Sequence, residues 1–343
     1  MDWLAHIWAV WVDWLAVHVI APSALAAGLH APGFDAHAVA ATTAIVLLQV
    51  AVIAGVFRPL EALAPAERWP DRKLTRIDQI YTLLMLFGLF PIFSYLVIEP
   101  LIASFAGGGQ ASEGGVGLDL RHLIPWFDDH PLALLAFYYV VYDLTYYWMH
   151  RAQHLIPWWW ALHSMHHSQR QMSCWSNDRG SYLDGILQSF ILASVGVAMG
   201  VDIEQYAWLT LISELMQNLS HANVRFGFGP VLERVLVDPP FHRLHHMAVD
   251  ERRPDLHNCN FGQVFSVWDR LFGTALYGEP VRPTGVTDPV VDADNGRNLV
   301  AMQWHTLRRF WCAIGCREGW RPGDVGFGSD YRPFPTGPTG KPL

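Results

Sequence analysis

Charged residues are scarce in this 343-residue chain. Asp, Glu, Lys and Arg make up 16% of it, against about 25% in an average soluble domain. Hydrophobic residues make up 52%, which excludes a disordered chain, because disorder needs low hydrophobicity and high charge. The net charge of −8 argues against a nucleic-acid partner, which requires a basic surface. The composition indicates a membrane protein.

Cysteine is also rare, with four residues in the chain. Four scattered cysteines do not form a disulfide scaffold. Cys312 and Cys316 form one CxxxC pair without the second pair that a zinc knuckle needs. The sequence also lacks an HPGG haem motif, a GxGxxG fingerprint and the four-cysteine spacing of an iron–sulfur cluster. Any electrons that the protein uses must therefore come from a separate donor.

Several long apolar runs predict membrane helices, each of which needs about 20 mostly apolar residues. We expect spans at 38–57, 80–105, 131–149 and 185–201, with a more polar one at 206–219. Residues 3–29 are apolar but have no basic start, which favours a Trp-rich interfacial or spanning helix over a signal peptide. The predicted fold is therefore an all-α integral membrane bundle of about 4–6 membrane helices.

Positive charge predicts the orientation, because Lys and Arg accumulate in cytoplasmic loops. Residues 58–79 contain five Lys or Arg residues, whereas residues 106–130 contain only Arg121. The first loop is therefore expected in the cytoplasm and the second on the far side. The third span then ends near His150 on the cytoplasmic face, and the following hairpin returns His221 to that face.

Histidine is abundant and unevenly placed. Eight of the 17 histidines fall in three motifs, HRAQH (150–154), HSMHH (163–167) and HRLHH (242–246). Residues three or four apart share one face of a helix, so each motif presents two or three imidazoles to one point. Imidazole binds Zn, Cu, Fe and Ni, and eight ligands exceed the four of a zinc site, which predicts two metals. The expected ligands are His150, His154, His163, His166, His167, His221, His242, His245 and His246, with His257 as a possible addition.

Two further features lie near these motifs. Asp143, seven residues before His150, is expected to accept a hydrogen bond from a ligand histidine or, alternatively, to bond a neighbouring helix. Trp158, Trp159 and Trp160 follow the third span and are expected to anchor it at the membrane interface. The histidines outside the motifs are interpreted as ordinary buried or interfacial residues: His6, His18, His30, His37, His122, His130 and His305.

The ordered set of motifs resembles the fatty acid hydroxylase/sterol desaturase superfamily of integral membrane di-iron enzymes. The resemblance rests on YDLTYYWMHRAQH (142–154), WALHSMHHS (160–168), LSHANVRFGFGP (219–230), PPFHRLHHM (239–247) and HNCNFGQVFSVWDRLFGT (257–274), with Phe261 where Tyr is usual. It covers about residues 131–280 and implies a helical cytosolic cap that holds two non-haem iron ions. It also implies Asn260 as a supporting residue outside the ligand set.

This resemblance implies an O2-dependent hydroxylase of an unactivated C–H bond in a lipid, such as a fatty acyl, ether-lipid or sterol-like substrate. A desaturase would use the same ligands and stays open. The implied partners are a membrane lipid and a separate electron donor, either a reductase with ferredoxin or a small haem carrier.

Two other classes compete with this interpretation. A metal transporter needs polar residues along its spans, and a bis-His haem protein needs pairs on facing helices rather than adjacent His doublets. The expected organisation is N-terminal membrane helices at 1–130, a catalytic core at 131–280 and a cytosolic tail at 281–343.

Overall fold

The computed structural model describes residues 2–26, 28, 34–89, 120–199, 201, 203–248, 253, 256 and 258–315. The named secondary-structure elements in these residues are all helices. Within them the only β pairing consists of two isolated bridges, Pro65 with Val224 and Met247 with Thr284. The predicted all-α class is therefore confirmed for this part of the chain.

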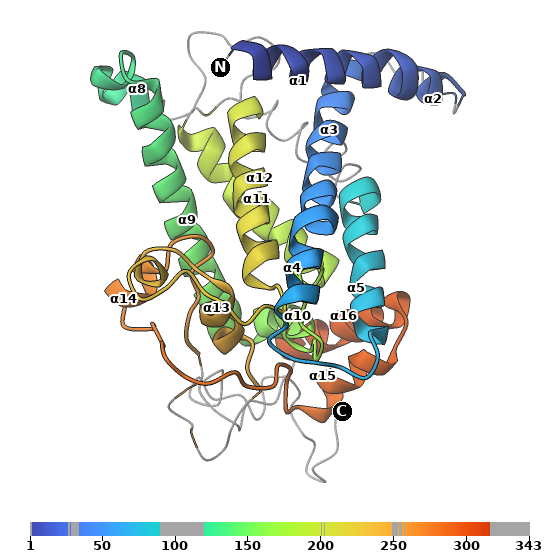
Figure 1. The fold of residues 1–343 in the computed structure, drawn as a ribbon, viewed down its shortest axis with the longest axis vertical. Helices are drawn as coiled ribbons and strands as arrows, with labels where there is room; N and C mark the ends of the chain where they lie inside the picture. The colour runs from blue at the N-terminus through green and yellow to red at the C-terminus, as the bar shows by residue number, and fades with distance from the viewer. Residues whose placement is uncertain are drawn as a thin grey trace.

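The first half of the chain forms an N-terminal helix and two helices of the bundle. α1 (Asp2–Leu15), a π turn (Ala16–Ile20) and α2 (Ala21–Ala26) lie across one end of the molecule (Figure 1). α3 (Ala36–Val52) continues through a π turn (Ile53–Phe57) into α4 (Arg58–Leu63). α5 (Lys73–Leu84) follows and ends in a π turn at Met85–Leu89.

The second half supplies the rest of the bundle and its lower end. α9 (Pro131–Leu155), α11 (Tyr182–Met199) and α12 (Ile203–Ser220) run beside α3 and α5 along the long axis, and α8 (Leu120–Leu123) precedes α9 (Figure 1). The short elements α10 (Pro157–His167), α13 (Pro239–His245), α14 (Val267–Leu271) and α15 (Pro289–Asp292) gather with α16 (Leu299–Gly315) toward the other end. Short 3₁₀ turns lie at Pro125–Phe127, Leu232–Arg234 and Ala293–Gly296.

Two helices among the described residues are long and apolar enough to cross a membrane, namely Ala5–Ala26 and Ala36–Leu63. They contain most of the N-terminal apolar segment and the whole of the span predicted at 38–57. Tyr182–Gly196 is apolar but shorter, and α9 and α12 are long but more polar. Most of the span predicted at 80–105 lies outside the described residues. The number of membrane helices therefore stays a prediction.

Proline places the break that shapes the lower end. Pro157 lies at the first turn of α10, and Ile156 before it has an extended backbone (φ −93°, ψ 116°). Proline disfavours the helical conformation at the residue that precedes it, so α9 ends at Leu155 and the chain turns. The turn brings the histidines of α10 back against those at the end of α9.

Candidate metal centre

The nine histidines predicted as ligands meet at the lower end of the bundle, in two adjacent groups. The first group contains His150, His154, His163, His167 and His245, and the second contains His166, His221, His242 and His246. Within each group, one nitrogen of every ring lies within 4.8 Å of the others. The two groups touch, because the ring centroids of His167 and His246 are 4.2 Å apart.

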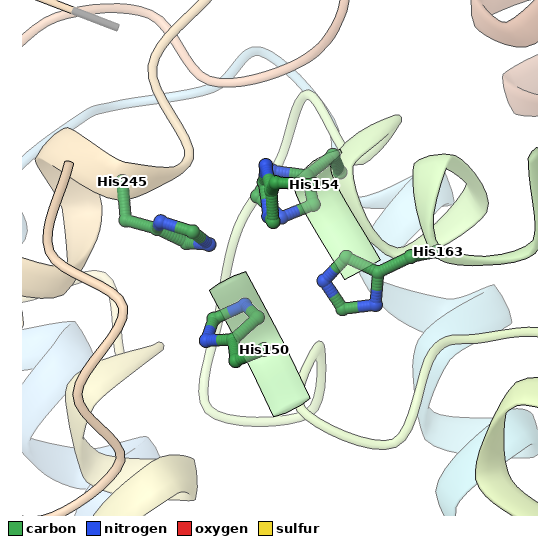
Figure 2. Close-up of side chains that lie close together, drawn as sticks. His150, His154, His163 and His245 are labelled. Atoms are coloured by element: carbon green, nitrogen blue, oxygen red, sulfur yellow. The ribbon is translucent and has the colours of Figure 1, made fainter. Parts of the chain in front are cut away.

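Local structure explains this convergence. His150 and His154 are four residues apart on α9 and so share one helix face. Figure 2 shows their rings and those of His163 and His245 pointing toward one common centre from three different helices. His221 directly follows the last residue of α12. α13 begins at a cap in which Asp238 accepts a hydrogen bond from the Phe241 backbone N–H, at 2.9 Å.

Five of the rings are held through Nδ1. In four rings this atom bonds a backbone oxygen at 2.7 to 2.9 Å. The pairs are His150 with Phe261, His166 with Arg179, His221 with Gln217, and His245 with Cys259. In His163 this atom bonds Oδ2 of Asp184, at 2.9 Å. A carbonyl oxygen only accepts, so Nδ1 carries the proton in these rings and Nε2 keeps the free lone pair. Such a partner on the second nitrogen is typical of metal-binding histidines.

The lone pairs that result have no protein donor. Nε2 of His166 and Nε2 of His221 are 3.1 Å apart, although both rings carry their proton on Nδ1. Within the described part of the chain, the Nε2 atoms of six other rings are buried without a hydrogen-bond partner: His150, His154, His163, His167, His245 and His246. Buried acceptors without donors are costly, and a cation bound between the rings removes that cost. The residues present therefore fit a metal in each group.

Burial also favours the neutral form of several of these imidazoles. It lowers the pKa of His245 to about 3 and that of His221 to about 4, and neighbouring histidines add to the effect. The pKa values of His166, His167 and His246 are held well below the ordinary histidine value by the same causes, burial first. Neutral imidazole is the form that binds metal.

Asp184 supports a histidine of the first group, a role that sequence spacing alone does not assign. It is buried on α11, and its Oδ1 accepts hydrogen bonds from Gln153 Nε2 and Trp159 Nε1, each at 2.8 Å, while its Oδ2 faces His163. A carboxylate 17 residues after the HSMHH motif has no helical spacing to it. Only the packing of α11 against α9 and α10 brings it to the ring.

Among the described residues, Asp143 bonds no histidine, which corrects the expected bond to a ligand ring. Its carboxylate accepts from the backbone N–H groups of Val264 and Phe265 and from Trp268 Nε1, at 2.8 to 3.1 Å. The alternative, a bond to a neighbouring element, is therefore the one observed. The segment that Asp143 holds begins three residues after Phe261, whose carbonyl holds His150.

Asp269 supports the same segment from its other side. It accepts from the backbone N–H groups of Phe261 and Gly262, at 2.7 and 2.8 Å, and burial raises its pKa to about 6. Gly262 is required here because a Cβ would lie 2.7 Å from the Phe265 backbone oxygen and 2.9 Å from the Asp269 carboxylate.

Asn260 lies at a left-handed position (φ 60°), which Asn tolerates better than most residues. Its Nδ2 donates to the backbone oxygens of Phe241 and Leu276, and its Oδ1 accepts from the Leu276 N–H. It therefore fixes backbone next to His242 without touching a ring. His257 lies outside the described residues.

The tryptophan run is not a simple membrane anchor, which corrects that expectation. Trp159 is 7% exposed and bonds Asp184. The Trp160 ring centroid lies 4.9 Å from that of His154 and 5.3 Å from that of His167. Two of the three indoles thus pack at or beside the histidine cluster. Trp158 stacks on Trp159 and contacts Phe310 of α16.

Comparison with known proteins agrees with this site. The model of the fatty acid hydroxylase family matches residues 135–274, a segment that contains all nine histidines. Among curated proteins, the chain is 30% identical to human alkylglycerol monooxygenase over 196 residues, which is 57% of this chain and 41% of that protein. It is 26% identical to an ornithine lipid hydroxylase of Rhizobium tropici, over 48% of this chain and 49% of that protein.

A Delta(7)-sterol 5(6)-desaturase of Gibberella zeae is 28% identical over 42% of each chain. Each of these alignments spans less than half of the relative's own length. No solved structure matches the chain. Residues 135–274 thus match the fatty acid hydroxylase family, and the named relatives support a place for this segment in the fatty acid hydroxylase/sterol desaturase superfamily.

Proposed function

We propose that this protein is a membrane-bound, O2-dependent di-iron oxygenase that hydroxylates an unactivated C–H bond of a lipid. One observation carries the proposal: nine histidines lie in two touching groups, with buried lone pairs that no protein donor satisfies. The relatives named above are, by name, two lipid oxygenases and a sterol desaturase, which supports a lipid substrate.

The histidines divide between two iron ions in this proposal. His150, His154, His163, His167 and His245 hold one ion, and His166, His221, His242 and His246 hold the other. When bound, a di-iron centre supplies O2 activation and oxidation of the C–H bond. The protein holds five of these rings in the tautomer that leaves Nε2 free, through four backbone carbonyls and the Asp184 carboxylate.

The surroundings of the site suit an apolar substrate. Tyr146, Met149 and Leu162 belong to the main core of the bundle and lie on the two helices that carry five of the ligands. Such walls exclude water and accept hydrocarbon, so the reactive carbon reaches the metals in a dry environment. A lipid enters such a site from the bilayer side of the bundle.

The membrane arrangement is part of the same proposal. Two apolar helices of spanning length support a membrane protein, and the Lys and Arg distribution supports an active site on the cytoplasmic face. We propose a bundle of about 4–6 membrane helices, formed by residues 1–130 and part of 131–280, with a cytosolic helical cap around the metals and a cytosolic tail at 281–343. Electrons come from a separate reductase with a ferredoxin or a small haem carrier.

The experiment is metal analysis of the purified protein, with an absorption spectrum. We expect about two iron ions per chain, one for each group, and no Soret band. A haem spectrum, or binding of metal without any oxidised lipid when a reductant and O2 are supplied, would defeat the proposal. The lipid product separates the two oxidation outcomes, because hydroxylation adds about 16 mass units and desaturation removes about 2.

A further inference from the structure

The C-terminal described helix, α16, has an outer face that is apolar although it is exposed. Its inner side buries Met302, Thr306, Arg309 and Ala313. Its outer side exposes four apolar side chains: Val300 80%, Trp304 61%, Trp311 66% and Ile314 49%. These positions recur at helical spacing, so they form one stripe along the helix. We call this stripe the outer face of α16.

This exposure does not come from loose packing, because α16 is firmly attached through its inner side. The Arg309 guanidinium is buried and lies 2.6 Å from the Asp294 carboxylate. Gln303 Nε2 donates to the Gly180 backbone oxygen at 2.9 Å, and the Thr306 hydroxyl contacts the sulfur of Met165. Met165 lies between His163 and His166 on α10, so α16 is packed directly against a helix that carries ligands.

The outer face continues onto a bundle helix. An open groove of about 670 Å³ lies between α5 and α16, lined by Ile77 and Ile80 on one side and by Leu299, Val300 and Trp304 on the other. Farther along the chain, Leu83, Leu84 and Phe87 are exposed at 43%, 43% and 47%. The apolar surface of α16 thus joins exposed apolar side chains of α5 and of the π turn that follows it.

The charges that border this surface are mainly positive. α16 has no Asp or Glu in its 17 residues, and Arg308 is exposed between Trp304 and Trp311. On α5, Lys73 and Arg76 are exposed beside Ile77, with Asp71 as the acidic neighbour of Lys73. Tryptophan, aliphatic side chains and arginine together are typical of helices that lie in the headgroup region of a bilayer.

We infer that the outer face of α16 lies in the headgroup region of a phospholipid bilayer, with Trp304 and Trp311 among the upper acyl chains and Arg308 at the lipid phosphates. The groove between α5 and α16 then takes part of one acyl chain. This inference rests on the membrane location in the proposed function. Because α16 packs on α10, it would hold the histidine cluster at a fixed depth beneath the headgroups.

The test measures contact with lipid in the full-length protein, and it needs neither metal nor turnover. An environment-sensitive fluorophore is attached at Trp304→Cys or Trp311→Cys, in a background with Cys312→Ser and Cys316→Ser. Cys174 and Cys259 are buried and stay in place. The protein is reconstituted in phosphatidylcholine–phosphatidylglycerol vesicles that contain a nitroxide lipid. Val300→Cys is the replacement site if a tryptophan variant does not fold.

Two labelled positions calibrate the result. Thr287→Cys is exposed in the loop before α15 and serves as the aqueous control, and Val56→Cys is exposed on the Ala36–Leu63 helix and serves as the lipid control. We expect nitroxide near the glycerol end of the acyl chain to quench labels at 304 and 311 at least about twofold more than at 287. Nitroxide at the chain terminus should quench them less, because interfacial helices lie only about 5–10 Å deep.

The outcomes are distinguishable from failure of the proposed function. The inference is overturned if iodide in the water quenches the labels at 304 and 311 as strongly as it quenches the label at 287. Labels shielded from both quenchers would also overturn it, because another part of this chain or a second copy would then cover the face. Loss of quenching at Val56 as well would instead count against the membrane location itself.

Discussion

Asp184→Asn offers a sharp test of how the protein prepares its histidines. The substitution keeps the shape of the side chain but replaces one carboxylate oxygen with an NH2 group. In the native protein, three donors converge on this carboxylate: Gln153 Nε2, Trp159 Nε1 and His163 Nδ1. Either orientation of the amide therefore places the NH2 group against at least one of these donors.

The expected loss of metal affinity or stability follows from the amide orientation that keeps the most hydrogen bonds. If the amide oxygen stays with Gln153 and Trp159, the NH2 group faces His163. The ring can satisfy it only by moving its proton to Nε2, which removes the lone pair needed for metal. Loss of such a supporting partner typically lowers metal affinity about 10–100-fold, or about 1.4–2.7 kcal/mol. If the ring keeps its proton on Nδ1, the unsatisfied donor costs about 1–3 kcal/mol of folding stability instead.

The assay is titration of the metal-free protein with iron in competition with a chelator, together with a thermal unfolding curve. Asp294→Asn is the matched control, because Asp294 is also buried and charged but pairs with Arg297 and Arg309 rather than with a histidine. The control should lose stability and keep its metal affinity. An Asp184→Asn protein with affinity within about twofold of wild type and unchanged stability would refute the reasoning.

Three further changes test the site and its boundary. His166→Ala and His245→Ala each remove one ligand from a different group, so each should abolish lipid oxidation and lower the iron content by up to about one ion per chain, while the protein still inserts; normal turnover in either would contradict the ligand assignment. His305→Ala should be tolerated, since this ring lies on α16 outside both groups. Complete loss of activity would contradict this and would mean that the catalytic core extends beyond residue 280. Asp143→Ala should lower the free energy of unfolding by about 2–4 kcal/mol, because one buried and two partly buried donors lose their acceptor. Trp268→Phe, which removes one of these bonds, should cost about 1 kcal/mol, and equal melting temperatures of the two variants would contradict the role of this carboxylate.

The sequence by itself determined which residues form the histidine cluster that we propose to bind metal. HRAQH, HSMHH and HRLHH each specify neighbouring imidazoles because helical spacing is a local property of the chain. The same holds for the break at Pro157 and for the apolar helix at 36–63. His221 lies outside the three motifs, so helical spacing did not predict it. Its position at the end of the expected hairpin was the reason to place it with the other histidines.

Only the tertiary structure decided how those residues are divided and supported. Adjacent histidines separate into different groups, as His166 and His167 do, because neighbouring side chains on a helix point in different directions. Asp184 reaches His163, and Asp143 reaches Trp268 instead of a ring, because of where α11 and α14 pack. Such contacts join residues 21 and 125 positions apart. Sequence periodicity reports which face of a helix a residue occupies, whereas the partner on that face is set by packing between distant segments.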